Sequence, residues 1–239
     1  MKKYLSNIGL LTACALLLVL PACKLTCITG SGNKISEDRK VSDFTAIRIS
    51  GNFKVKLVQD SSLNLHITTD DNLLKYIKTR VEGDKLIVSN EDVCTNGDQE
   101  ITIGVHNLNA LHASGAVEVT SDGKINTGDM EIELSGSTKV TLDLNAARLT
   151  TKGSGSTEVN LKGQASTHNI DLSGSGNVNA LDFIVGDYNI STSGSSDCQI
   201  NVLRELNVRS SGSSSIKYRG TPTQINNSKS GSSSIEKIN

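Results

Sequence analysis

The sequence predicts an all-β protein built as a right-handed, single-stranded parallel β-helix, a solenoid with coils of about 19–20 residues. Two observations predict this fold. A Ser-Gly pair recurs at steps of 21, 19, 19, 20, 18 and 19 residues, and apolar residues stand at fixed distances from each pair. Aromatic residues make up only 3% of the chain, so the core must be aliphatic. The pairs begin at Ser114, Ser135, Ser154, Ser173, Ser193, Ser211 and Ser230.

Columns of apolar residues justify the strands of each coil. Five residues after the serine, the side chain is aliphatic in six of seven rows, and the other row has Cys198, a small hydrophobe when buried. We expect further inward columns three and five residues before each serine and seven after it. Because strand side chains alternate between two faces, each coil should bury these columns and stack on the next through backbone hydrogen bonds. The first column is Val119, Val140, Val159, Val178, Cys198, Ile216 and Ile235.

The Ser-Gly pairs predict tight corners between strands. Glycine adopts positive φ at little cost, and serine bonds neighbouring backbone groups in turns. A right-handed winding follows from the strong preference for right-handed crossovers. The runs at 153–156 and 173–176 are not expected to bind phosphate, since that requires a helix N-terminus and a following Lys.

The first half of the chain predicts the same strands with longer excursions, as at the entry to a solenoid. Period-2 apolar runs indicate strands, Asp70 is expected to cap a short helical turn, and Gly83-Asp84 indicates a hairpin. The strands are expected around 44–57, 63–67, 81–88 and 101–105, the turn over 73–77 and a polar loop over 93–99.

The last coil loses its apolar character. Asn227 and Lys237 occupy columns that hold aliphatic residues in earlier coils. A solenoid must end, and an open last coil invites edge pairing. We interpret the polar coil as a cap; the alternative is a homo-oligomer formed through this C-terminal coil.

The N-terminus predicts export and lipid attachment. Lys2-Lys3 precedes an apolar stretch from Ile8 to Leu20 that is short for a membrane span. Leu20-Pro21-Ala22-Cys23 resembles a bacterial lipobox, which makes Cys23 the expected lipidation site and a lipid anchor the contact with the membrane. Lys24 favours the outer membrane, on its periplasmic or cell-surface side. The expected organisation is a signal peptide (1–22), a lipidated Cys with a flexible tether (23–40) and a β-helix domain (41–239), with irregular coils over 41–110 and regular coils over 111–239.

Composition and charge exclude some partners. Without residues 1–22 the chain has 22 basic and 25 acidic side chains, a net charge of −3, which gives no basic footprint for nucleic acid. Beyond Cys23, three cysteines remain, and an odd number cannot all pair within the chain. A Cys27–Cys94 disulfide is one option, with Cys198 left free.

The sequence predicts no catalytic residue, no cofactor site and no metal site. No histidine has a second His or Cys at metal-ligand spacing, and His168 occupies an inward column. His66 and His106 are expected to point outward. The acids are scattered, and the column four residues after each serine alternates in sign, which indicates an outward ladder of weak charge pairs. That column is Glu118, Lys139, Glu158 and Asn177.

The order of these motifs resembles a family of bacterial proteins described as putative auto-transporter adhesins with a head domain. The resemblance covers about residues 40–239. It rests on the lipoprotein leader, the stretch from Phe44 to Val55, Asp71-Asn72-Leu73-Leu74, Gly83-Asp84-Lys85-Leu86 and the Ser-Gly repeats. It implies a right-handed β-helix at the cell envelope and brings no catalytic residue.

We therefore expect a non-catalytic binding or structural module that adheres to glycan or protein. One alternative is a polysaccharide-active enzyme on the same scaffold, and another is a periplasmic envelope assembly or stress component. A cleft with several carboxylates and a Lys or Arg within hydrogen-bond reach would favour the enzyme.

Overall fold

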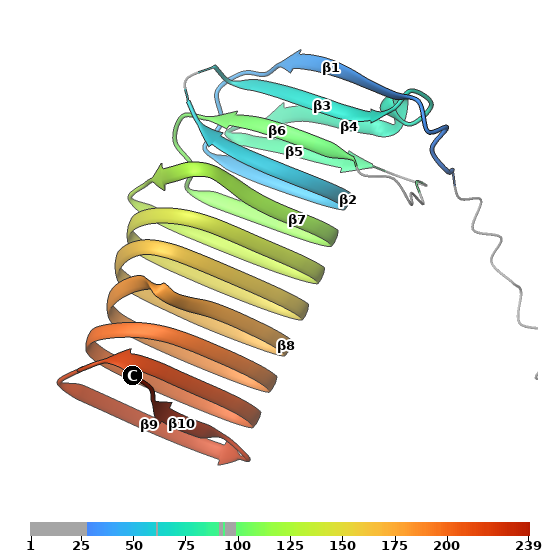
Figure 1. Ribbon diagram of the computed structural model, residues 1–239. Coiled ribbons are helices and arrows are strands. Elements are labelled where there is room, and N and C mark those ends of the chain that lie inside the picture. Colours follow the sequence, from blue (N-terminus) through green and yellow to red (C-terminus); the bar gives the residue numbers. More distant parts are fainter. Residues whose placement is uncertain (1–27, 61, 91–92, 94–98) are drawn as a thin grey trace, which may run out of the picture.

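The computed structural model describes residues 28–60, 62–90, 93 and 99–239, and this part of the chain is all-β. Figure 1 shows it wound as a stack of coils, with β1 at one end and β9 and β10 at the other. The strands form one mixed sheet with the order β1-β3-β6-β2-β7-β8-β10. They are β1 (Lys34–Lys40), β2 (Ala46–Gln59), β3 (Asn64–Asp70), β4 (Ile77–Glu82), β5 (Lys85–Asn90), β6 (Glu100–Val105), β7 (Ala110–Asn126), β8 (Asp129–Gly220), β9 (Gln224–Gly231) and β10 (Ser234–Lys237).

Successive coils pair in parallel, with each Ser-Gly pair on the next. Ser114 and Gly115 of β7 align with Ser135 and Gly136 of β8, and β8 aligns with β9 in the same way at its last pair. The predicted inward columns are buried in the middle coils, where Val119, Val140, Val159 and Val178 have no exposed surface. At the ends of these columns the side chains are exposed: Asn109, Ile225, Asn227 and Lys237. A further inward column, one residue before each serine, was not predicted; it begins with Ala113, Leu134, Gly153 and Leu172. Like residues thus stack on like, and the aliphatic core runs along the stack axis.

The corner glycines are required both by conformation and by space. The corner glycines from Gly115 to Gly231 have φ between +82° and +110°, a region that L side chains rarely adopt. At each of them, a Cβ atom would lie only 2.4–2.9 Å from the carbonyl oxygen of the glycine one coil earlier. Only glycine lets the backbones of adjacent coils approach this closely at the corner.

The first coil lies outside the regular Ser-Gly period. Ser50 and Gly51 of β2 align with Ser114 and Gly115 of β7, so they form an eighth row of the stack. The residues between these two rows fold over the far side of β2. There β5 and β6 pair with β2 in parallel, β3 pairs with β6 antiparallel, and β1 pairs with β3 antiparallel. We call the strands β1, β3, β4, β5 and β6 the N-terminal cap.

Two sequence-based expectations differ from the structure in this cap. The tether prediction is wrong for residues 34–40, because β1 pairs along its whole length with β3 and the sheet begins before residue 41. The expected cap by Asp70 is also wrong: the 3-10 turn at Leu74–Tyr76 has no side-chain cap, and the Asp70 carbonyl oxygen accepts a bond from the Leu73 N–H. The predicted hairpin at Gly83-Asp84 is confirmed as β4 and β5.

At the other end, the core becomes polar before the stack ends. The inward positions that flank the corner hold Thr192, Ser196, Ser210 and Ser214, all buried. The Thr192 hydroxyl lies 3.1 Å from Ser210 Oγ and 2.9 Å from Ser214 Oγ. These bonds satisfy the hydroxyls of Thr192, Ser210 and Ser214, whereas the buried Ser196 hydroxyl has no partner among the described residues.

Candidate functional site

One outward face of the stack gathers polar side chains from every coil. It consists of the residues two and four positions before each corner serine, which alternate with buried residues of the same strands and therefore point to solvent. We call it the amide face. Its column two residues before the serine is Arg48, His112, Glu133, Lys152, Asp171, Ser191, Arg209 and Ser228, and the column four residues before is Ala110, Glu131, Thr150, Asn169, Asn189, Asn207 and Asn226.

The N-terminal half of the amide face is charged, and its charges pair with each other. Lys152 Nζ lies 2.5 Å from Glu131 Oε1 and 3.4 Å from Glu133 Oε1. His112 Nδ1 lies 2.7 Å from Glu133 Oε2. His112, Glu133 and Lys152 line an open groove of about 360 Å³ together with Arg48.

These contacts change the pKa of two groups. Partial burial alone would raise the pKa of Glu133, but the hydrogen bonds and charges of His112 and Lys152 outweigh it and lower the pKa. The hydrogen bonds from Lys152 to Glu131 and then to Glu133 raise the pKa of the lysine. Both side chains are thus held in their charged forms.

The C-terminal half of the amide face carries a ladder of asparagines. Asn189 Nδ2 donates to Asn169 Oδ1 at 2.9 Å, Asn207 Nδ2 donates to Asn189 Oδ1 at 2.9 Å, and Asn226 Nδ2 donates to Asn207 Oδ1 at 2.7 Å. All the bonds run in the same direction along the stack. The ladder borders a groove of about 860 Å³, which shares Lys152 and Asp171 with the smaller groove.

Two charged residues beside the ladder differ from those in the charged half. Asp171 and Arg209 are exposed, and neither forms an ion pair with another described residue. Ser191 lies between them in the same column. Since successive coils are about 4.8 Å apart, the two charges stand about two coil spacings from each other. Asp171, an acceptor, and Arg209, a donor of charge-assisted hydrogen bonds, therefore both face solvent next to the asparagine ladder.

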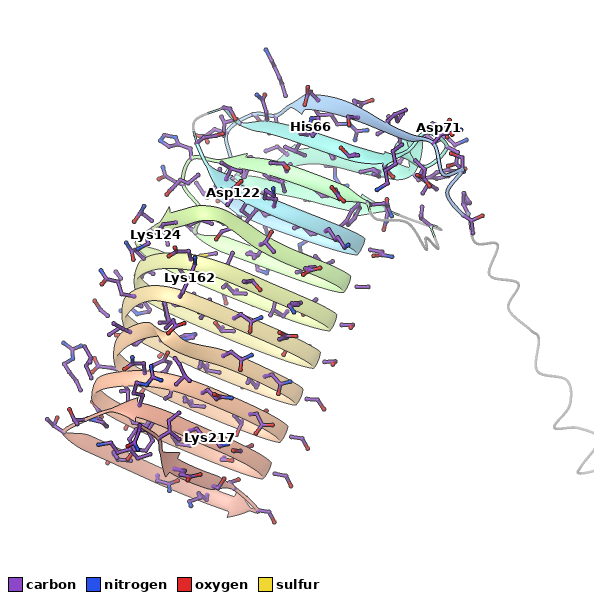
Figure 2. The ribbon with its side chains drawn as sticks, viewed as in Figure 1. His66, Asp71, Asp122, Lys124, Lys162 and Lys217 are labelled. Atoms are coloured by element: carbon purple, nitrogen blue, oxygen red, sulfur yellow. The ribbon has the colours of Figure 1, made fainter. Side chains whose placement is uncertain are left out.

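On the strand face after the corner, Lys139 and Glu158 of the predicted charge ladder pair with each other. Lys139 Nζ lies 3.2 Å from Glu158 Oε1, and the hydrogen bond from Asn160, followed by that from Lys139, lowers the pKa of Glu158. Farther around the coil, Asp143 lies between two lysines, 3.8 Å from Lys124 Nζ and 3.5 Å from Lys162 Nζ. Figure 2 shows Lys124 and Lys162 following one another down this side of the stack.

The histidines lie where the sequence predicted. His66 and His106 are exposed, and His66 Nδ1 pairs with Asp38 at 2.7 Å. His168 is fully buried, its Nε2 lies 2.9 Å from the Thr151 hydroxyl, and burial lowers its pKa to about 3. Burial likewise raises the pKa of Cys198 to about 12. These two buried groups are therefore neutral core residues.

Some predictions fall outside the described residues, and others concern absences. Cys23, Cys27 and Cys94 are not among the described residues, so lipidation and the Cys27–Cys94 pairing stay predictions. Within the part of the chain that the structure describes, no three His, Cys, Asp or Glu side chains are arranged to hold a metal ion. In that same part, no helix has the length and apolar character needed to cross a membrane.

Sequence reasoning missed the amide face. The apolar columns and the column four residues after the serine were aligned, but the outward positions two and four residues before the serine were not. The signal was present in the sequence, because Asn169, Asn189, Asn207 and Asn226 each stand four residues before a corner serine. An amide recurring at one outward position in four successive coils indicates a side-chain ladder.

Residues 43–222 match the family model described as "Putative auto-transporter adhesin, head GIN domain". The chain belongs to this family. The match includes β2 to β8, and with them the N-terminal cap except β1 and the amide face up to Arg209. No sequence among the curated proteins matches this chain.

Solved structures of three Bacteroidetes proteins share the fold. A putative adhesin from Bacteroides fragilis is 24% identical with a TM-score of 0.79, over 88% of this chain and all of the other. A putative lipid binding protein from Parabacteroides distasonis is 22% identical with a TM-score of 0.66, over 89% of this chain and 99% of the other. A putative adhesin from Parabacteroides merdae is 18% identical with a TM-score of 0.58, over 90% of this chain and all of the other. At these identities, the likeness is one of fold.

Proposed function

We propose that this protein is a cell-envelope lipoprotein whose right-handed, single-stranded parallel β-helix is a non-catalytic module for adhesion to glycan or protein. The amide face is the observation that carries the proposal. It is a continuous polar surface with hydrogen-bonding groups in every coil, supported by a rigid aliphatic core. Binding surfaces of this kind are typical of solenoid proteins, which present one extended face to a partner. The family name and the names of two structural relatives agree with it.

The right-handed winding rests on the general handedness of parallel β crossovers. An experimental density map that resolves the individual coils would test it. A left-handed winding would contradict this part of the proposal and leave the binding surface unchanged.

A polysaccharide-active enzyme is the alternative that the charged half favours, since Lys152 pairs with Glu131 and Glu133, and Lys152 and Glu133 line a groove. Glycosidases use one carboxyl as a general acid, and its pKa must be raised toward neutrality. The pKa of Glu133 is lowered instead, and that of Lys152 is raised, which makes the lysine a poor base. These groups neutralise one another, which supports a binding role. Cleavage of a polysaccharide by the purified protein, abolished by Glu133→Gln, would reverse this conclusion.

Membrane attachment through acylated Cys23 would place the module at the outer membrane. One structural relative is named a lipid binding protein. For this chain we assign the lipid contact to the anchor, because the exposed side chains that line the grooves of the amide face are polar or charged except Ile225. Mass spectrometry of the mature N-terminus would detect the acyl chains, and a Cys23→Ser variant should be released from the membrane fraction.

The adhesive function is tested by binding of the full-length protein, in detergent micelles, to glycan and matrix-protein arrays. Protease treatment of intact cells reports whether the module faces the medium. Binding together with protease sensitivity supports adhesion. Absence of binding to every surface, together with full protection from protease, would contradict adhesion and favour the periplasmic assembly or stress component.

A further inference from the structure

We propose that the C-terminal half of the amide face binds an extended glycan that carries carboxylate groups, with the sugar chain parallel to the stack axis. This inference rests on the proposed binding function and names the ligand class of its surface. The residues that carry it are Asn169, Asn189, Asp171, Ser191 and Arg209, which lie in three successive coils beside the groove of about 860 Å³.

The ladder leaves hydrogen-bonding capacity for a ligand. A side-chain amide has two N–H donors and an oxygen with two lone pairs. Asn189 uses one N–H and one lone pair in the ladder, and Asn169 uses one lone pair only. The remaining groups point to solvent from a ladder whose bonds hold the amides in place. A ligand therefore meets fixed donors and acceptors, which reduces the entropy lost on binding.

The spacing of these groups selects the kind of polymer. Equivalent amides are one coil apart, about 4.8 Å. Side chains on one side of an extended peptide repeat every two residues, about 6.6 Å, so a peptide falls out of register by nearly 4 Å after two coils. One ring of an extended 1,4-linked polysaccharide, whether a β-linked glucan or the α-linked galacturonan, advances by nearly the coil spacing, and each ring offers hydroxyl donors and acceptors. The ladder thus matches a sugar chain and mismatches a peptide.

The unpaired charges of Arg209 and Asp171 determine which substituents on the sugar rings can bind. Arg209 presents a guanidinium that is not neutralised within the described residues, and arginine binds carboxylate in a bidentate manner. Asp171 accepts hydrogen bonds from sugar hydroxyls, with the Ser191 hydroxyl between the two charges. We infer that a carboxylate of the glycan contacts Arg209 while neutral ring hydroxyls contact Asp171 and the amides.

Length dependence is a further consequence of a ladder. Each coil contributes a few hydrogen bonds, which are individually worth little in water. A longer chain engages several coils at once, so its affinity should rise with length until the ladder is covered. A pocket that recognises a single sugar would show no such rise.

The test is calorimetric titration of the full-length protein in detergent micelles with four probes: short and long oligogalacturonate, a neutral cello-oligosaccharide and polyglutamate. We expect long oligogalacturonate to bind most tightly. Arg209→Ala should weaken this binding about tenfold, the loss of one charge-assisted hydrogen bond, and Asn189→Ala by a smaller factor. Lys217→Ala is the matched control, because it removes an equal charge from an exposed position on another strand face (Figure 2).

Each outcome decides between the two proposals. Equal binding of polyglutamate and long oligogalacturonate would overturn the glycan assignment in favour of a simple charge effect. Binding that Arg209→Ala and Asn189→Ala leave unchanged would overturn the site. If the arrays detect another ligand whose binding these variants do not affect, the adhesive function stands and this inference fails. Thermal unfolding of both variants, expected to be unchanged at these exposed positions, separates loss of binding from loss of fold.

Discussion

At the N-terminal end of the stack, β5 and β6 pair with the far side of β2, whereas at the C-terminal end β9 and β10 pair with β8 on one side only. Covered by the N-terminal cap, the first coil keeps large apolar residues such as Phe53 and Leu57 fully buried. In the last coil, every residue of β9 is exposed, and Asn227 and Lys229 occupy inward columns. One end is closed by additional chain, and the other by a change of side chains.

The two ends show two ways in which a stack of similar coils can end. An open sheet edge pairs with other chains, and an inward-pointing charge is one of the ways in which natural proteins prevent it. The gradual loss of apolar residues toward Lys229, through Thr192 and Ser210, leaves Ile225 as the aliphatic side chain that β9 exposes. We therefore keep the polar cap as the interpretation of this end, with a homo-oligomer through the C-terminal coil as the alternative.

The largest effect is expected in the middle of the stack. Val159→Asp places a carboxyl without a partner in a fully buried column, which should cost about 4 kcal/mol or more of unfolding free energy. Ile235→Asp changes the same column in the last coil, where the side chain is only half-buried, and should cost far less. Urea denaturation measures both. Equal losses would mean that the last coil is as tightly packed as the middle.

A corner substitution should have the next largest effect. Gly174→Val combines a φ of +98° with a Cβ position 2.7 Å from the Gly155 carbonyl oxygen. We expect it to lower the unfolding free energy by about 2–4 kcal/mol. Gly123→Val is the control, since Gly123 has a φ of +85° but no atom within 4 Å of its Cβ position. If both variants lose the same stability, the contact between coils contributes nothing.

The buried histidine should make stability depend on pH. The pKa of His168 is about 3 in the folded protein, below the ordinary value of 6.5, so the unfolded chain binds its proton first as pH falls. The stabilisation is fully present above pH 6.5 and is lost by about 1.4 kcal/mol per pH unit between 6.5 and about 3. Denaturation curves at pH 7.5 and 4.5 measure the loss. His168→Phe removes the titrating group, and an equally steep pH dependence in that variant would assign the effect elsewhere.

The smallest effect on stability, but a change in assembly, is expected in the last coil. Asn227→Ile combined with Lys229→Leu restores apolar side chains to inward positions and should cause self-association, measured by sedimentation velocity. Ser228→Ile combined with Lys217→Leu makes similar changes at outward positions and should leave the protein monomeric. If the inward pair also remains monomeric, the side chains of the last coil do not control its end.

The regular part of the fold could be predicted from the sequence because stacking repeats one environment at a fixed interval. Val159 and Val178 meet the same neighbours, so the same residue type recurs. The N-terminal cap could not be predicted in this way, because β1 and β3 pair across more than twenty residues without any repeat. Ser50-Gly51 was missed for the same reason: its partner row follows 64 residues later, after the cap has been inserted.

The candidate site was less predictable than the core. Buried columns can be recognised in the sequence because apolar residues recur in them. An exposed position tolerates most polar residue types and therefore gives a weak pattern. Pairings such as Lys152 with both Glu131 and Glu133 depend on which rotamers neighbouring coils permit, which the sequence does not specify. Only the asparagine ladder had a period that the sequence could have revealed.

The corner, in which each glycine lies against the glycine before it, also has a consequence for the size of the molecule. Every middle coil packs in the same way on the coil before it and on the coil after it. One coil of 18 to 21 residues could therefore be duplicated or deleted between Ser114 and Ser211 without altering either end. Each duplication would lengthen the rod by about 4.8 Å and add one step to its outer surface. The number of coils is thus an adjustable quantity, so the length of the rod can change while its two ends stay the same.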